Sequence, residues 1–286
     1  MKRYTALLAV IALAGASLAC SVDLGIPRLQ TGPTETLTIA EPLPEDAAAV
    51  DLTINMAAGE LDLTGGAEGV LEGEIRYNVP EWAPEIENDG DRLTLSQGDS
   101  DTNVGLPTSG TQIINEWTLQ LGDIPYALEL NAGAYDGSLD LSGVPLRRLE
   151  VHDGASNAEV IFNSLNPEEM SELRYETGAS SVELRGLANS NAAEVVFTGG
   201  AGDYTLDFSG ELQRDMDVTI NAGVSSLRIS VPEGTSVEVN IDSSLTDVDI
   251  DGDWSQSGDT YSLSGSGPTI TIDVDMGVGS LTLETN

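Results

Sequence analysis

Four aspartates near the C-terminus have the spacing of a calcium-binding loop. Asp247, Asp249, Asp251 and Asp253 lie in the segment DVDIDGD, which places acids at loop positions 1, 3 and 5 and a glycine at position 6. Position 12 is Gly258, where such a loop requires a bidentate glutamate. Apolar residues alternate with these aspartates, so an exposed strand explains the pattern without a metal. We therefore expect weak Ca²⁺ association and no other cofactor, with a specific calcium site as the alternative.

The chain offers few residues for catalysis. One histidine and one cysteine are too few for a disulfide framework or for a zinc site built from Cys and His. His152 precedes Asp153 at an expected turn, where a single imidazole is more often a surface residue than a general base. Carboxylate pairs carry little information here, because 48 acidic residues bring some together by chance. The sequence predicts no catalytic residue and no enzymatic activity.

The N-terminus is laid out as an export signal. Lys2 and Arg3 precede an apolar run, and small residues lead to the segment ASLAC, which ends at Cys20. This arrangement resembles the lipobox of bacterial lipoproteins, although Ser17 stands where such boxes prefer leucine. The resemblance implies that residues 1–19 are a signal peptide and that Cys20 is lipidated. The protein is then exported and lipid-anchored, either on the outside of the cytoplasmic membrane or in the outer membrane.

The charge of the chain excludes several partners. The formal net charge is −37, from 48 acidic and 11 basic residues; loss of Lys2 and Arg3 with the signal leaves 9 basic residues and a net charge of −39. Nucleic acid and anionic lipid would both repel such a surface, so the membrane partner is reached through the lipid alone. Residues 20–47 contain several prolines and are predicted to form a semi-extended tether, within which TETLTI (34–39) could form an edge strand.

Beyond the tether, apolar and polar residues alternate at period two and predict almost continuous β-structure. Examples are VDLTI (50–54) and WTLQL (117–121). Only NPEEMSEL (166–173) indicates a helical turn, with Asn166 as its cap. Residues 251–268 are rich in turn formers and are predicted to form a projecting hairpin whose Trp254 and Tyr261 offer contact surface, because exposed aromatic residues often anchor interfaces.

An internal repeat marks the C-terminal half. Each unit has a short strand, a glycine-marked corner and a second strand, and the corners follow one another at spacings of 21, 24, 22, 23, 21 and 33 residues. In the first two units the apolar pair after the corner lies two positions later than in the others, at Leu139 and Leu141 and at Val160 and Phe162. The corner residues are Gly133, Gly154, Gly178, Gly200, Gly223, Ser244 and Gly277.

One such unit cannot bury its apolar face alone, but stacked units can. The sequence therefore predicts an all-β protein, a stacked-coil β-solenoid of about seven coils over residues 125–286, preceded by a smaller β N-terminal part over residues 48–124. A glycine repeated at one corner of every layer fits a place of positive φ or close backbone approach. An antiparallel sandwich is the alternative, although it does not explain the recurring spacing.

These segments also resemble a known family. GELDLTGG (59–66), NEWTLQL (115–121) and the glycine units look like the bacterial toast-rack family, whose N-terminal domain of unknown function precedes repeats similar to those of candidate adhesins. The repeats also resemble the C-terminal part of proteins from the cell-wall-active antibiotic response group. The resemblance implies a stacked β-fold and an envelope location, and it brings no catalytic residues.

From this resemblance we expect a non-enzymatic lipoprotein of the cell envelope that acts as a surface interaction or adhesin-like module. Its partner is an unidentified protein or glycan surface. Two alternatives remain open: an envelope-stress accessory protein, by analogy with the antibiotic-response relatives, and a glycan-processing enzyme of the kind that parallel solenoids can host.

Overall fold

The computed structural model describes residues 28–44, 47–98, 106–107 and 112–286. Eight long strands make up most of it: β3 (Val50–Ala67), β9 (Tyr126–Asp140), β10 (Leu146–Ile161), β11 (Met170–Arg185), β12 (Ala192–Asp207), β13 (Met216–Val231), β14 (Ser236–Asp251) and β17 (Thr269–Thr285). The shorter elements are β1 (Arg28–Leu29), β2 (Glu35–Glu41), β4 (Leu71–Tyr77), η2 (Pro80–Trp82), β5 (Glu85–Asn88), β6 (Arg92–Ser96), β7 (Leu106–Pro107), β8 (Asn115–Gly122), η3 (Leu187–Ser190), β15 (Ser255–Ser257) and β16 (Thr260–Leu263).

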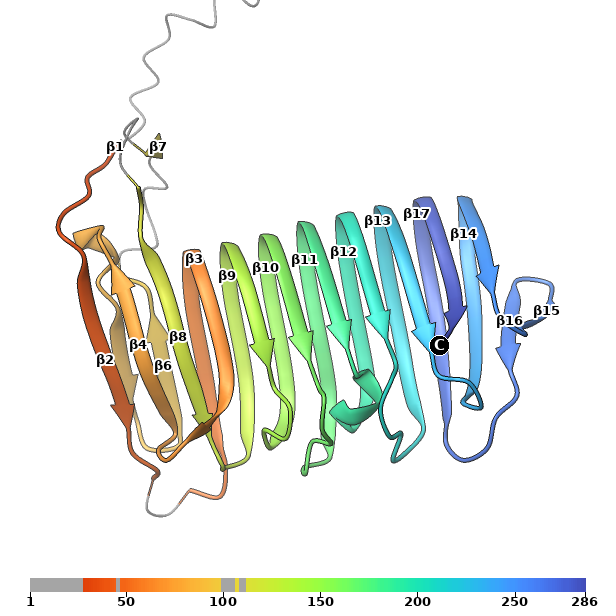
Figure 1. The fold of residues 1–286 in the computed structure, drawn as a ribbon, viewed down its shortest axis with the longest axis horizontal. Coiled ribbons are helices and arrows are strands. Elements are labelled where there is room, and N and C mark those ends of the chain that lie inside the picture. The colour runs from red at the N-terminus through yellow and green to blue at the C-terminus, as the bar shows by residue number, and fades with distance from the viewer. Residues whose placement is uncertain (1–27, 45–46, 99–105, 108–111) are drawn as a thin grey trace, which may run out of the picture.

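Each long strand bends back on itself at its middle and forms one coil with two arms (Figure 1). The eight coils stack in parallel, in the order β3, β9, β10, β11, β12, β13, β17, β14, within one open sheet. The predicted stacked-coil solenoid is therefore confirmed. Seven coils lie after residue 125, and β3 adds an eighth within the predicted N-terminal part.

The core lies between the two arms of the coils. Alternate residues of each arm face inward and stack on their equivalents in the next layer, as Leu128, Leu149 and Leu173 do in β9, β10 and β11. Their side chains join one cluster that includes residues from Ile39 near the start to Leu283 near the end. Burying a leucine of this kind contributes about 1.5–3 kcal/mol, so apolar packing between the layers is a main source of the fold's stability.

Close backbone approach explains the glycine at the corners. A Cβ added to Gly154 would lie 2.7 Å from the carbonyl oxygen of Gly133 in the layer before it, and the same clash repeats at Gly178, Gly200 and Gly223. Of the two predicted reasons for these glycines, close backbone approach is therefore confirmed. Positive φ is not needed, because these corner glycines are absent from the positive-φ residues of the described chain.

The first coil carries Ala57 at its corner and is capped by side chains. Among the described residues, no earlier coil passes this corner, and Gln97 Oε1 accepts a hydrogen bond from the backbone N–H of Ala57 at 3.0 Å. Asn115 Nδ2 donates to the carbonyl of Ala58 at 2.5 Å and to Gln97 Oε1 at 3.0 Å, while its Oδ1 accepts from Trp117 Nε1 at 2.8 Å. These side chains satisfy backbone groups that another coil would otherwise satisfy.

The N-terminal end of the solenoid splits into two short sheets. The first arm of β3 pairs with β6, which pairs with β5. The second arm pairs with β8, followed by β4 and then by β2 as the edge strand. Residues 35–41 of the predicted tether thus belong to the sheet, as the TETLTI pattern allowed, because Ile39 is buried in the core.

The C-terminal end departs from sequential stacking. The last strand, β17, lies between β13 and β14, so the sixth and seventh repeats of the sequence are exchanged in space (Figure 1). The spatial order of the layers at this end therefore differs from the order of the repeats in the chain. The long spacing of 33 residues before Gly277 is needed because the chain makes β14, then the β15–β16 hairpin, and then returns inward.

Two local expectations are also corrected. The first two glycine units are not displaced: Gly137 and Ala158 stand in register with Val182, and the ring of Tyr135 fills the space that a side chain at Gly137 would need. Residues 166–173 form no helical turn. The fully buried Asn166 accepts from the backbone N–H of Glu168, but its side chain also bonds the backbone of Leu146 in β10 and of Ser190 in η3. Within the described ranges, no helix has both the length and the apolar character to span a membrane.

Candidate functional site

His152 and Asp153 lie on opposite sides of β10 and do not form a catalytic pair. The imidazole is on the outer face, with Nδ1 3.3 Å from a carboxylate oxygen of Glu176 and Nε2 3.6 Å from one of Glu150. Asp153 points toward the core, where the hydroxyl of Tyr175 donates to its Oδ2 at 2.7 Å. An imidazole and a carboxylate separated by the strand cannot share a proton, so His152 and Asp153 form no acid–base dyad.

Asp153 is the centre of a polar network inside the corner. Besides Tyr175, its carboxylate accepts hydrogen bonds from the hydroxyls of Thr177 and of Ser156, the latter at 3.0 Å. Tyr175 Oη also lies 3.3 Å from Tyr135 Oη. Burial, and then the neighbouring Tyr135 and Asp153, raise the pKa of Tyr175. These hydroxyls satisfy a carboxylate that faces the core, so the network serves the fold.

The four predicted calcium ligands are exposed and do not converge. Asp247, Asp249 and Asp251 alternate along the outer face of β14, and Asp253 follows in the turn. In the part of the chain that the structure describes, no group of three His, Cys, Asp or Glu residues is arranged to hold a metal ion. Weak Ca²⁺ association with this face stays a prediction, which a thermal-unfolding titration with CaCl₂ against MgCl₂ checks.

Trp254 and Tyr261 belong to the predicted hairpin, which the structure forms as β15 and β16. Strand β16 pairs antiparallel with the first arm of β14, opposite Val237–Asn240. Both aromatic side chains are partly buried and contact the end of the core cluster. They therefore lie at the end of the solenoid as a cover for the core rather than as fully exposed contact residues.

Most of the ion pairs among the described residues involve β10 and β11. Arg148 contacts Glu150 and Glu172, and Arg174 contacts Glu172 and Glu176. The hydrogen bond to Glu172 is the main cause that raises the pKa of Arg174. Arg147 likewise pairs with Glu168 at 2.9 Å. Exposed pairs of this kind add little stability.

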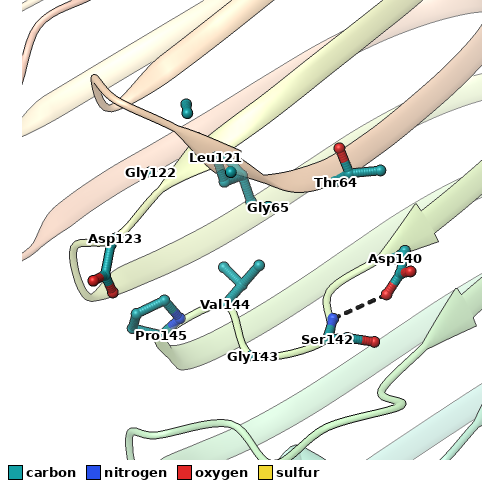
Figure 2. Close-up of a pocket in the computed structure, with 12 residues that line it drawn as sticks. Thr64, Gly65, Leu121, Gly122, Asp123, Asp140, Ser142, Gly143, Val144 and Pro145 are labelled. Atoms are coloured by element: carbon teal, nitrogen blue, oxygen red, sulfur yellow. Dashed lines mark hydrogen bonds between the residues drawn. The ribbon is translucent and has the colours of Figure 1, made fainter.

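A surface hollow of about 450 Å³ lies where the ends of β3 and β8 approach the β9–β10 loop (Figure 2). Its lining is largely glycine and apolar, with Val144 and Pro145 between the carboxylates of Asp123 and Asp140 in the view. One of the two, Asp140, already accepts a hydrogen bond from the backbone N–H of Ser142 at 3.1 Å. The hydroxyl of Ser142 also lines the hollow, and it accepts a hydrogen bond from the backbone N–H of Asn163 at 2.7 Å.

The signal segment and Cys20 lie outside the described residues, so the predicted lipidation has no structural account. The residues that sequence reasoning missed are polar and buried: Gln97, Asn115 and Asn166. Asn115 begins the NEWTLQL segment that carries the family resemblance, and its place in the cap of the first corner gives that segment a structural role.

Fold and surface together define an acidic rod of stacked β-coils with side-chain columns on its outer faces. The family model described as the N-terminal domain of toast_rack, DUF2154, matches residues 30–185 and again residues 164–230. The chain belongs to this family. Because the two matches overlap and run far into the glycine units, the family pattern includes the repeated coils as well as the N-terminal part.

Several solved structures are similar to the chain. A candidate cell adhesion protein of Clostridium sporogenes has 22% identity and a TM-score of 0.48, over 89% of this chain and 99% of that one. A candidate lipid-binding protein of Parabacteroides distasonis has 12% identity and a TM-score of 0.41, over 90% and 99%. A candidate adhesin of Bacteroides fragilis has 12% identity and a TM-score of 0.35, over the same shares. Likenesses at these scores add nothing to the family assignment. No curated protein matches the chain.

Proposed function

We propose that this protein is a non-enzymatic lipoprotein of the cell envelope that works as a surface interaction module. The observation that supports this most is the division of roles within each coil. Inward residues fill one continuous core, while outward residues form columns of side chains along two faces of a rod. Faces of this kind offer broad contact surface, as the concave or flat faces of other repeat proteins do.

The chemistry of the described residues supports a binding role over a catalytic one. The single histidine is separated from Asp153 by the strand, and the hydroxyl of Ser142 in the hollow accepts a hydrogen bond from the backbone N–H of Asn163. Attachment through Cys20 would hold the acidic body near a membrane whose anionic lipids repel it. The lipid would thus fix the location, and the rod would meet partners away from the bilayer.

The proposal is tested with a strain that lacks the chain and is complemented with the wild type or with Cys20→Ser. We expect the deletion to reduce attachment of cells to surfaces or to one another. Cys20→Ser should release the protein into the medium and fail to restore attachment, although the purified variant unfolds at the wild-type temperature. Unchanged attachment in the deletion strain contradicts the interaction role. Degradation of any member of a panel of neutral and anionic polysaccharides, with CaCl₂ present, contradicts the non-enzymatic assignment.

A further inference from the structure

The terminal coil, β14, is finished on one arm and unfinished on the other. Strand β16 covers the first arm, where Val237 and Val239 are buried to 2% and 0% exposure. Within the described residues, no strand pairs with the far side of the second arm, residues 245–251. That arm therefore presents a free row of backbone N–H and C=O groups.

The unfinished arm also leaves apolar surface open. Ile250 is 40% exposed, whereas its equivalents in all seven other coils are 0% exposed. Val248, one inward position earlier, is only partly buried. A further strand on this edge would cover both side chains as β16 covers the other arm. The equivalents of Ile250, in spatial order, are Leu63, Leu139, Val160, Leu184, Leu206, Ile229 and Leu283.

The outer face of the same arm has a distinct charge pattern. Asp247, Asp249 and Asp251 occupy all three outward positions, at intervals of about 7 Å along the strand. The other coils are acidic at two of these positions at most; β17, directly next to β14, has Ser280, Thr282 and Glu284 there. Two copies of the chain meeting at this edge would bring like charges face to face, which is destabilising.

We propose that the second arm of β14 is a docking edge for an extended basic segment of a partner protein, which adds as a strand. Backbone hydrogen bonds would hold the segment, as in other cases of strand addition. Lys or Arg at alternate positions would face Asp247, Asp249 and Asp251, and the apolar residues between them would cover Val248 and Ile250. The inference rests on the proposed interaction role and gives it a partner chemistry.

The test measures binding of synthetic peptides to the mature chain by fluorescence anisotropy. The probe is Lys-Val-Lys-Thr-Lys-Val-Lys, and the control is Lys-Lys-Lys-Lys-Val-Thr-Val, which has the same composition without alternation. We expect the alternating peptide to bind at least tenfold more tightly. An alternating peptide that is N-methylated along one edge should lose this advantage, because it cannot donate the backbone hydrogen bonds. Equal binding of all three peptides overturns the proposal in favour of general charge attraction.

A pair of matched variants locates the edge. Replacing Asp247, Asp249 and Asp251 by serine should weaken the binding of the alternating peptide at least tenfold. Replacing Glu60, Asp62 and Asp136 by serine removes the same charge from exposed positions on coils with neighbours on both sides, and should change binding less than threefold. Equal loss of peptide binding in both variants overturns the proposal. The proposal is also overturned if the wild type self-associates and the first variant does not. Because purified protein is used, a negative result leaves the cell-attachment test of the proposed function unaffected.

Discussion

Gly277 stacks directly on Gly223, although Ser244, which lies on its other side, is the corner residue that precedes it in the chain. A Cβ added to Gly277 would lie 2.7 Å from the carbonyl oxygen of Gly223. The C-terminal strand has therefore entered the stack between two strands that are made before it. The backbones of β13 and β17 approach closely at this corner. The exchanged strand therefore needs glycine there for the same reason as the strands that stack in chain order.

The layer order is tested with cysteine pairs in a Cys20→Ser background. Asn221 is adjacent to Asp275 in the register of β13 and β17, so cysteines at these positions lie within disulfide reach, about 5 Å between Cα atoms. Asn221 and Asp242 lie two layers apart, about 10 Å, which is beyond that reach. We expect an intramolecular disulfide only in the Asn221→Cys/Asp275→Cys variant, detected by mass spectrometry. The opposite result would establish sequential stacking.

Substituting a corner glycine should be costly. In Gly178→Ala, the new Cβ would meet the carbonyl oxygen of Gly154, and backbone on both layers would have to shift. We expect a loss of about 1–3 kcal/mol in the free energy of unfolding, measured by urea denaturation. Gly32→Ala is the control, because its Cβ would lie at an ordinary 3.5 Å from Pro80 Cγ. An unchanged stability for Gly178→Ala would contradict the close approach at the corner.

Trp254 should contribute to stability because it covers the end of the core. Trp254→Ala is expected to lower the free energy of unfolding by about 2 kcal/mol, somewhat less than the loss at a fully buried tryptophan. Gln256→Ala changes an exposed side chain of the same hairpin and should have almost no effect. Thermal unfolding followed by circular dichroism compares the two variants. If both unfold like the wild type, Trp254 has no covering role.

The carboxylate of Asp153 should stabilise the corner network. Asp153→Asn leaves hydroxyl donors such as Tyr175 facing an amide group, and we expect a cost of about 1–3 kcal/mol. Asp136→Asn is the control on an exposed outward position and should stay within about 0.5 kcal/mol of the wild type. Chemical denaturation at pH 7 measures both. A similar stability for the two variants would show that the network contributes nothing.

Alkaline pH should destabilise the fold through buried tyrosines. Burial raises the pKa of Tyr126 to about 12. The folded state thus holds this proton more tightly than the unfolded state, in which the phenol has its ordinary pKa of about 10. The resulting stability is fully present below pH 10 and is lost as the pH rises toward 12.

Urea denaturation from pH 8 to pH 12 checks this pH dependence. The wild type should lose stability steeply above pH 10, and Tyr126→Phe should lose less over the same interval. Below pH 10 the variant should be less stable by about 1 kcal/mol at every pH, because the hydroxyl donates to the carbonyl of Val70 at 2.6 Å. Parallel curves over the whole interval would exclude Tyr126 as a source of the alkaline loss.

The sequence was sufficient to predict the coils but not their complete order. Period-two alternation and close-approach glycines are local signals, and they placed strands and corners correctly. The exchange of β14 and β17 has no such signal, because the spacing of 21 residues from Gly223 to Ser244 suits direct stacking as well. The first coil was not counted because Ala57 replaces glycine where no earlier backbone comes close.

The site residues were harder to predict because their roles depend on contacts between distant segments. Trp254 and Tyr261 look like exposed hairpin aromatics in the sequence, yet pairing of β16 with β14 brings them against the core. Nothing in the sequence distinguishes Gln97 and Asn115 from other polar residues, because their role depends on contact with the corner of β3. The alternation around Asp249 correctly indicated an outward face, but only the layer order reveals that this face borders an open edge.

Because β17 lies between β13 and β14, the stack at this end can form only after residues 269–285 have been synthesised. A chain that stops before residue 269 would contain β13 and β14 but not the strand that separates them. Such a product would have to join these two strands directly or leave a gap, so a prematurely ended chain should differ from the finished protein in shape as well as in length. Residues 269–285 thus separate two strands that are synthesised before them and determine the layer order at this end of the rod.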